Sequence, residues 1–324
     1  MSAPIATIDV SAPGAGAELV RELGARSCAF VVGHGVPDEL RQRIRAVSDA
    51  FFDLPEAEKA HVQWPGDGPW YGWQPVYLGL PELTGTRVPD PIERFEARLS
   101  DPGPGAPDTP AAWADTFDLW PDRPSDFVAT WVEYYLALRA VATRLFTVIA
   151  DELDLPAEDL PAWTDDQFAN LVANHYLAQP EPPAEGAIRS GAHTDQGGLT
   201  LLSADHAPGG LEVRFPDTDD WVPVLIPPEG FLLQVGDLLE HWTNHRIRGN
   251  HHRVANPPRD SGAVARRLAI VYFHYPRLDS VIHVAPSGLA PGETAAPPLI
   301  AGEHLLKRER TYRDRRDSLP ESVQ

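Results

Sequence analysis

The stretch GAHTDQGGLTLL, residues 191–202, places a histidine and an aspartate two positions apart just before an apolar run. Alternate residues of a strand face the same side, so His193 and Asp195 could direct both side chains at one ion. In a chain with 12 histidines and 47 acidic residues, such a tripeptide arises by chance about once or twice. Taken alone, it fits polar residues at the entrance to a strand as well as it fits a metal site.

Candidates for a third ligand lie further along, in the stretch GDLLEHWTNHRIRGNHHRVANPP, residues 236–258, whose histidines are His241, His245, His251 and His252. Two histidines and one carboxylate from separate strands form the facial triad of non-haem Fe(II) oxygenases, which leaves coordination positions open for substrate and dioxygen. Arg267 follows at the start of the apolar run RLAIVYFHYP. A buried arginine needs an anionic partner, and its planar guanidinium can hold a carboxylate through two parallel bonds.

Composition narrows the class of protein. The chain has 324 residues, of which 43% are apolar, so it can bury a sizeable core. Its net charge of −20 argues against nucleic acid or an anionic membrane as a partner, because either would require a basic face. Cys28 is the only cysteine, which excludes a cysteine-based zinc or iron–sulfur site and leaves nitrogen and oxygen ligands for any metal.

The sequence shows neither the pattern of a signal peptide nor that of a membrane-spanning segment. The first residues, MSAPIATIDV, lack the basic and apolar regions of a signal peptide. No run of 18 uncharged apolar residues occurs. We therefore predict a cytoplasmic protein.

The first half of the chain has mostly helical patterns. Residues 28–32 (CAFVV) indicate a buried strand, and DELRQRIRAVSDAFF after Pro37 predicts a helix. The longest helix is expected over roughly 126–152 with Ser125 as its cap. The aromatic stretch WPGDGPWYGWQPVYLGLP at 64–81 shows neither periodicity and is expected to be a loop.

After Ala169 the pattern changes to short apolar runs separated by Gly, Pro and Asp. These runs are LVANHYL, LTLLSA, LEVRF, WVPVLI, FLLQVG, RLAIVYFHY and SVIHVA. Strands of this length and spacing are typical of a β-sandwich or barrel. The sequence predicts helices from the N-terminal part packed on a C-terminal β core.

Several of these segments, in this order, resemble the iron- and 2-oxoglutarate-dependent dioxygenases related to isopenicillin N synthase. They are SCAFVVGHGVP, FFDLPEAEK, NHYLAQP, HTDQGGLTLL, DHAPGGLEVRFPDTDDWVPV, GFLLQVGDLLEHWTN, HHRVANPP and RLAIVYFHYP. The resemblance implies a mainly β fold with α-helices, a double-stranded β-helix (jelly roll) core with packed N-terminal helices. We expect an N-terminal segment over 1–110, a long-helix region over 111–167, a catalytic core over 168–290 and a C-terminal tail over 291–324.

The resemblance also assigns the metal ligands. His193 and Asp195 match the first two iron ligands, and His252 matches the third through the family's His-Arg-Val motif. Strand alternation supports one ligand from the pair, because neighbouring residues face opposite ways. His251 is then expected at the surface or behind the ligands. His241 and His245, which flank the family's Trp-Thr-Asn, are expected to be structural.

Arg267 matches the arginine that binds the distal carboxylate of 2-oxoglutarate, and Tyr176 and Asn174 match positions that bond the same cosubstrate. The chain departs from the family at Ala269, where an Arg-x-Ser serine normally assists the arginine. Losing one hydrogen bond to a charged group is expected to weaken cosubstrate binding by about 1.5–3 kcal/mol unless a tyrosine or water replaces it. The departure leaves two alternatives: a 2-oxoglutarate-dependent enzyme, which we favour, and a four-electron oxidase of isopenicillin N synthase type.

The predicted activity is an Fe(II)- and 2-oxoglutarate-dependent oxygenase that uses O2 on a small molecule, in bacterial specialised metabolism. Asp195 occupies the position that a halide would need, so hydroxylation, desaturation or ring formation is expected rather than halogenation. A non-catalytic metal-binding jelly roll is the remaining alternative. Trp70, Tyr71, Trp73 and Tyr77 are candidates to line a substrate pocket or simply to pack. The sequence does not specify the substrate or the oligomeric state.

Overall fold

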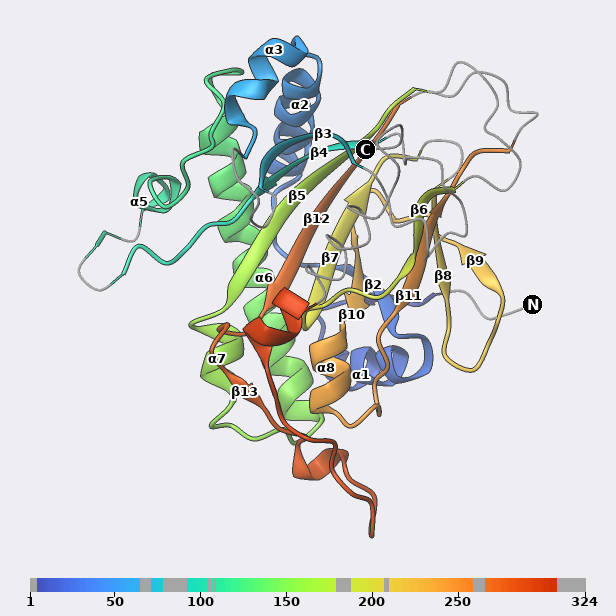
Figure 1. Cartoon of the computed structure of the whole chain (residues 1–324). Helices are drawn as coiled ribbons and strands as arrows, with labels where there is room; N and C mark the ends of the chain where they lie inside the picture. The colour runs from blue at the N-terminus through green and yellow to red at the C-terminus, as the bar shows by residue number, and fades with distance from the viewer. Residues whose placement is uncertain are drawn as a thin grey trace.

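A computed structural model of the chain describes residues 5–64, 71–77, 92–103, 106–107, 109–178, 188–206, 210–258 and 266–307 (Figure 1). The N-terminal elements are β1 (Thr7–Asp9), α1 (Ala15–Arg26), β2 (Cys28–Val32), α2 (Asp38–Phe52), α3 (Glu56–Lys59), η1 (Ala60–Val62), β3 (Gly72–Tyr77), β4 (Ile92–Ala97), α5 (Pro110–Ala114), α6 (Phe127–Glu152) and α7 (Leu160–Thr164). The remaining elements are β5 (Phe168–Tyr176), β6 (Ile188–His193), β7 (Leu199–Ala204), β8 (Gly210–Arg214), β9 (Trp221–Pro223), β10 (Phe231–Val235), α8 (Asp237–Trp242), β11 (His251–Ala255), β12 (Arg267–Tyr275), β13 (Val281–Ile282), η3 (Pro286–Gly288) and β14 (Leu299–Ile300).

Two facing sheets form the core. The described strands of the larger sheet have the order β1-β2-β10-β7-β12-β5-β4-β3, and those of the smaller sheet β6-β11-β8-β9. All their pairings are antiparallel except that of β1 with β2. This arrangement confirms the predicted jelly-roll core, and Figure 1 shows α2 and α6 on the side of the larger sheet away from the smaller one.

Two apolar clusters hold the layers together. Val172 and Val271 of the larger sheet pack with Leu211 and Val213 of the smaller sheet, which fills the space between the sheets. The other cluster joins the opposite face of the larger sheet to α1, α2 and α6, as predicted from the helical apolar stripes. Because α6 is buried along most of its length, it acts as the central support of that face.

The expected loop at 64–81 is wrong in part, because residues 72–77 form β3. The glycine and proline in this stretch hid the alternation typical of a strand. Among the described strands, β3 lies at the edge of the larger sheet, where a proline whose nitrogen faces away from β4 removes no hydrogen bond between strands. Gly72 is required at its start: its φ is +72°, and a Cβ there would lie 2.1 Å from the carbonyl oxygen of Val62.

The expected capping role of Ser125 is also wrong. The longest helix begins at Phe127 with Asp126 at its N-cap position, and no side chain caps it. The amide of Phe127 donates to the carbonyl of Pro124, so a turn containing Ser125 precedes the first helical residue. None of the helices in the described part of the chain combines the length and apolar character of a membrane span.

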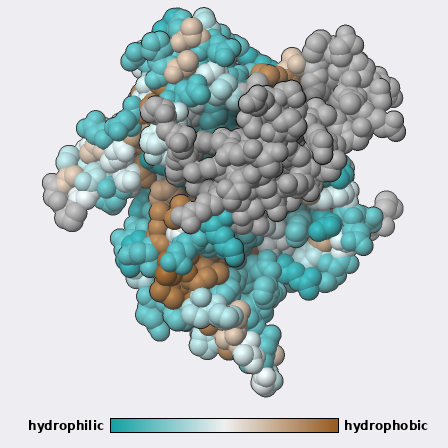
Figure 2. All heavy atoms as spheres, in the orientation of Figure 1, coloured by the Kyte–Doolittle hydropathy of each residue, from teal (hydrophilic) through white to brown (hydrophobic). Residues whose placement is uncertain are grey.

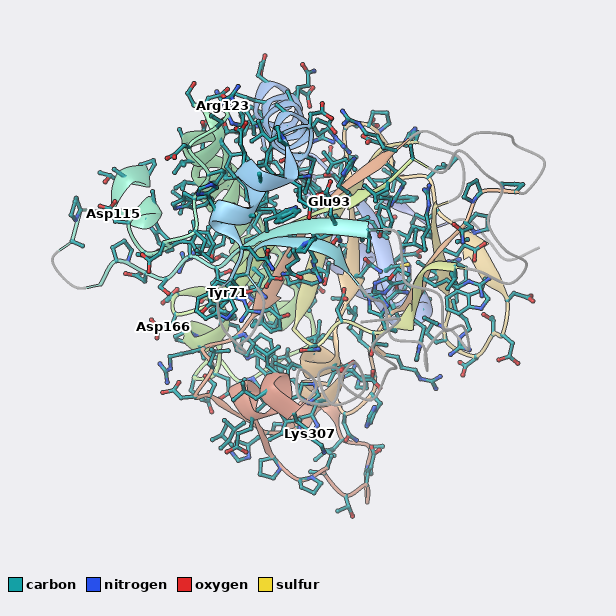
Figure 3. All side chains as sticks on the ribbon, turned by 45° about the horizontal axis from the view of Figure 1, so that its top comes forward. Tyr71, Glu93, Asp115, Arg123, Asp166 and Lys307 are labelled. Atoms are coloured by element: carbon teal, nitrogen blue, oxygen red, sulfur yellow. The ribbon has the colours of Figure 1, made fainter. Side chains whose placement is uncertain are left out.

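A buried polar network fastens α3 to the larger sheet. The Glu93 carboxylate accepts hydrogen bonds from Lys59 at 2.7 Å and Trp73 at 2.8 Å, and lies 2.9 Å from Nδ1 of His175. Figure 3 shows Glu93 between the β3–β4 hairpin and the helices. Burial alone raises the pKa of Glu93, but hydrogen bonds from His175, Lys59 and Trp73 outweigh it and hold this pKa below its usual value.

Replacing Lys59 with methionine should lower the free energy of unfolding by about 3–5 kcal/mol, because the Glu93 carboxylate would stay buried without its cation. Urea denaturation measures the loss. The double variant Lys59→Met/Glu93→Gln should regain part of it, since the amide carries no charge. A loss below about 1 kcal/mol in the single variant would mean that the pair contributes no more than an exposed ion pair.

Candidate metal centre

Three segments bring His193, Asp195 and His252 together. His193 ends β6, Asp195 lies in the turn before β7, and His252 is the second residue of β11. β6 and β11 are neighbours (Figure 1), and their register places His252 directly opposite His193. The imidazole centroids are 4.2 Å apart, and one ligand atom from each of the three residues lies within 4.8 Å of the others.

The backbone contacts of the two imidazoles show which ring nitrogen faces Asp195. Nδ1 of His193 lies 2.7 Å from the carbonyl of Gly191, and Nδ1 of His252 lies 3.1 Å from that of Asn250. Bonds of this kind assign the proton to Nδ1 and leave each Nε2 with its lone pair. Both Nε2 atoms face Oδ1 of Asp195, at 3.9 Å and 3.7 Å. These separations are too long for direct hydrogen bonds but suit donors that share one ion.

A hydrogen bond on the side away from the imidazoles orients the Asp195 carboxylate. The hydroxyl of Thr200 on β7 donates to its Oδ2 at 2.6 Å, so Oδ1 is the oxygen directed at the imidazoles. Asp195 and Thr200 are both buried. The set of two imidazoles and one carboxylate, each with a hydrogen-bonding partner behind it, fits Fe(II) with positions left open on one face.

Backbone packing explains the glycine pair that follows Asp195. The amide of Gly198 donates to the carbonyl of His274, and a Cβ on Gly197 would lie 2.2 Å from the same oxygen. On the other side, a Cβ on Gly236 would lie 2.3 Å from the carbonyl oxygen of Gly197. Only residues without a side chain allow β12 and the start of α8 to approach the Asp195 turn this closely.

The other histidines of the 236–258 stretch lie outside the cluster. His251 is exposed on the opposite side of β11 from His252, as strand alternation predicts. His245 is exposed and its Nδ1 lies 2.6 Å from Glu240. Burial lowers the pKa of His241, which is half-buried beside the carbonyl of Ile282. These positions agree with the roles expected for all three.

The proposed cosubstrate residues lie on neighbouring strands in the same interior. Arg267 at the start of β12 pairs in register with Tyr176 at the end of β5, and its guanidinium carbon lies 5.2 Å from the Tyr176 ring centroid. Burial lowers the pKa of Arg267, while the interaction with Tyr176, which includes a side-chain hydrogen bond, and the charge of Asp205 raise it. Asn174 lies two residues before Tyr176 and pairs in register with Ala269.

Ala269 is packed in an apolar cluster with Ile92, Tyr176 and Val254. No hydroxyl on β12 therefore stands where the family's serine would be. The side chain that does bond Arg267 is Tyr176, from the adjacent strand. Because Tyr176 is itself one of the expected cosubstrate positions, this bond adds a contact to Arg267 but does not replace the serine.

Sequence reasoning missed one charged residue of this interior. Arg189 on β6 is completely buried, and its guanidinium carbon lies 5.7 Å from the Tyr176 ring centroid. The only signal was an arginine four residues before His193 in a short strand. Of the aromatic candidates, Trp73 belongs to the Glu93 network and Tyr71 packs against Trp64, whereas Trp70 lies outside the described residues.

A separate surface pocket does not contain the candidate ligands. Ala162, Trp163, Trp242 and Ile282 contribute to its lining. Figure 2 shows apolar surface gathered in this area, at the lower left over α7 and β13. Trp163 and Trp242, which contribute to the lining, stack on each other with ring centroids 5.0 Å apart. The pocket therefore lies where the apolar core around the helices reaches the surface.

Comparison with known protein families gives two matches that together span most of the chain. Residues 167–276 match the family model of the 2OG-Fe(II) oxygenase superfamily. Residues 5–126 match the model described as non-haem dioxygenase in morphine synthesis N-terminal.

Similar proteins come from bacteria and fungi. The validamycin A dioxygenase of Streptomyces hygroscopicus subsp. limoneus is 33% identical over 295 residues, covering 86% of this chain and 76% of that protein. A 2-oxoglutarate-dependent dioxygenase of Aspergillus niger is 29% identical, covering 82% of this chain and 78% of that protein.

Solved structures share the fold. A 2OG-Fe(II) oxygenase family protein from Caulobacter crescentus superimposes with a TM-score of 0.80 at 24% identity, covering 96% of this chain and 100% of that one. Neurospora crassa T7H, in complex with alpha-KG and thymine, gives a TM-score of 0.78 at 24% identity, covering 95% and 97%.

Replacing His252 with alanine should weaken Fe(II) binding by more than the roughly 10–100-fold that loss of an outer hydrogen bond causes, because a ligand atom is removed. The matched control is His251→Ala on the neighbouring residue, whose side chain is exposed. It should bind Fe(II) as the wild type does. Anaerobic calorimetric titration measures both. Equal losses in the two variants would rule out the assigned pair of histidines.

Replacing Thr200 with valine should weaken Fe(II) binding by about 10–100-fold while the ligand set stays intact, because Asp195 loses the bond that orients it. The control Thr218→Val removes a hydroxyl that bonds the carbonyl of Phe215 in a turn. Its affinity should not change. Unchanged affinity in Thr200→Val would show that the Asp195 carboxylate needs no outer support.

Proposed function

The chain belongs to the 2OG-Fe(II) oxygenase superfamily, and on that premise we propose that His193, Asp195 and His252 bind its Fe(II). The observation that carries this proposal is the convergence of one ligand atom from each of the three residues within 4.8 Å, with each Nδ1 beside a backbone carbonyl. The enzyme is an oxidoreductase whose cofactors are Fe(II) and 2-oxoglutarate. When bound, they supply oxidation by O2 coupled to decarboxylation of 2-oxoglutarate to succinate and CO2.

The residues that we assign to 2-oxoglutarate are Arg267, Tyr176 and Asn174. Arg267 is 4% exposed, so its charge is desolvated and can grip a carboxylate through two parallel bonds. Tyr176 shares a hydrogen bond with this guanidinium and holds it in the interior between the sheets. Asn174, in the row between β4 and β12, offers an amide to the same ligand.

The match to the 2OG-Fe(II) oxygenase family model favours a 2-oxoglutarate-dependent enzyme over the four-electron oxidase. That alternative rested on Ala269, whereas Arg267 and Tyr176, which we assign to 2-oxoglutarate, pair in register on β12 and β5. The relative from Aspergillus niger is likewise named a 2-oxoglutarate-dependent dioxygenase. A non-catalytic jelly roll would have no need for an intact set of ligands with their outer hydrogen bonds.

The enzyme acts on small molecules, as its relatives do. Relatives include a validamycin A dioxygenase, a homoarginine-6-hydroxylase and a proline hydroxylase, whose substrates differ too much to transfer any one of them. We propose hydroxylation, desaturation or ring formation in bacterial specialised metabolism, in the cytoplasm where 2-oxoglutarate is produced. The division at 1–110, 111–167, 168–290 and 291–324 stays a prediction.

The activity is tested by adding 2-oxoglutarate to the anaerobic Fe(II) protein. A weak visible charge-transfer band should appear, and admission of O2 should yield succinate. Fe(II) binding without this band, together with substrate-dependent O2 uptake, would instead support the four-electron oxidase. Failure to bind Fe(II) would exclude both enzymes.

Replacing Arg267 with methionine should raise the 2-oxoglutarate concentration for half-maximal band intensity by at least about tenfold, because a charged hydrogen-bonding partner is lost. Arg266→Met is the matched control, since the neighbouring Arg266 is half-exposed and pairs with Asp53 and Asp49. It should leave the requirement unchanged. An unchanged requirement in Arg267→Met would give Arg267 another role.

A further inference from the structure

The guanidinium of Arg189 is the one fully buried cation between the described strands for which the proposed function gives no anion. Arg189 is 0% exposed, and none of its three side-chain nitrogens has a hydrogen-bond partner among the described residues. Burying an isolated charge is costly, so proteins pair such groups or use them to bind ligands. Arginine does not relieve that cost by losing its proton.

The direction of Arg189 follows from its contact with Tyr176. β6 belongs to the smaller sheet and β5 to the larger one, so the side chain reaches across the space between the sheets. Tyr176 also contacts Arg267, which places both guanidinium groups around one ring. Burial, followed by the repulsion of Arg267, lowers the pKa of Arg189.

The described carboxylates beside these strands already have partners. Asp205 accepts from Arg45 and from the amide of Leu268. Glu96 accepts from Arg98 at 2.9 Å and lies 3.7 Å from Arg94. None of them is paired with Arg189.

The sum of formal charges in this interior indicates that one anion is missing. With neutral histidines, the charges of Fe(II) and Arg267 are balanced by those of Asp195 and the two carboxylates of 2-oxoglutarate. Arg189 then leaves one positive charge in a desolvated interior, where an unbalanced charge is costly. We propose that Arg189 binds a carboxylate of the primary substrate, an inference that rests on the proposed function and narrows its substrate class to small carboxylic acids.

A second polar side chain without a partner supports a polar substrate. Gln74 on β3 is 8% exposed, and neither atom of its amide has a hydrogen-bond partner among the described residues. Gln74 is aligned across neighbouring strands with Arg94, Arg94 with Asn174, and Asn174 with Ala269. These four residues form one row across the larger sheet. Buried amides of this kind are normally satisfied, so a ligand group on this row would complete it.

The first measurement separates substrate binding from cosubstrate binding. In Arg189→Met, the anaerobic 2-oxoglutarate titration should stay within about twofold of the wild type, while Arg267→Met should shift by at least about tenfold. A shift in Arg189→Met as large as that in Arg267→Met would make Arg189 a second anchor for 2-oxoglutarate and overturn the proposal. Absence of the charge-transfer band in the wild type would instead overturn the proposed function.

The second measurement uses simple probes in place of the substrate. Acetate, butyrate and benzoate, each against its neutral amide, are added to the protein saturated with Mn(II) and 2-oxoglutarate. At about ten times its dissociation constant, a bound carboxylate should raise the midpoint of thermal unfolding by roughly 2–4 °C. The amides should have no effect, and Arg189→Met should lose the response to the acids.

The control for fold and for general charge is Arg253→Met, on β11 beside His252, where the arginine pairs with Glu212. It should keep the carboxylate response. Arg189→Lys retains the charge without the planar fork and should respond more weakly than the wild type, which keeps the test open if Arg189→Met does not fold.

Without probes, Arg189→Met should unfold at or above the wild-type midpoint, since it removes an unpaired charge. A fall of several degrees would add a structural role to Arg189, and the carboxylate response of Arg189→Lys would then decide the proposal. The proposal also fails if no carboxylate stabilises the wild type. It fails as well if Arg189→Met responds to carboxylates as the wild type does. If Arg189→Met does not fold, the same outcome in Arg189→Lys contradicts the proposal.

Discussion

The turn that carries Asp195 is held by backbone hydrogen bonds from α8, and the candidate metal centre depends on them. The amide of Asp237 donates to the carbonyl of Asp195 at 2.8 Å, and that of Leu238 to the carbonyl of Gly197 at 2.9 Å. These bonds require the close approach that Gly197 and Gly236 permit. With the turn fixed and Thr200 bonded to Oδ2, the other carboxylate oxygen points toward the imidazoles that the pairing of β6 with β11 places opposite each other.

The two sheets divide the chemistry between them. The smaller sheet contributes His193, His252 and Arg189, and the larger contributes Tyr176 and Arg267. The two candidate histidine ligands thus stand on the smaller sheet and the proposed cosubstrate residues on the larger one, with Asp195 in the turn that leads from β6 to β7, so a chelating dicarboxylate would bridge the interior. Clustering charges in this way destabilises the unliganded protein, a cost that the apolar clusters on both faces of the larger sheet offset.

Local patterns in the sequence were sufficient for much of this architecture. Continuous apolar runs predicted β2, β7, β10 and β12, and apolar residues at helical spacing predicted α2 and α6. Both patterns are visible in the sequence because a buried strand or helix face requires apolar residues at the buried positions. The choice of His252 over His251 followed from strand alternation together with the family motif, and the structure places the two side chains on opposite sides.

What the sequence did not reveal depends on contacts between distant segments. β3 forms because β4 pairs with it, although its own glycine and proline argue against a strand. Arg189 resembles any arginine before a metal motif until the opposite sheet covers it. The support of Asp195 by Thr200 depends on the bend of the turn between them, which no residue pattern specifies.

The central claim is that these two histidines and this aspartate form the iron site. A crystal structure grown anaerobically with Fe(II) and 2-oxoglutarate tests it most directly. The account predicts iron bound by Nε2 of His193, Nε2 of His252 and an oxygen of Asp195, with the distal carboxylate of 2-oxoglutarate on Arg267. Iron on any other set of residues, or 2-oxoglutarate bound away from Arg267, would contradict it.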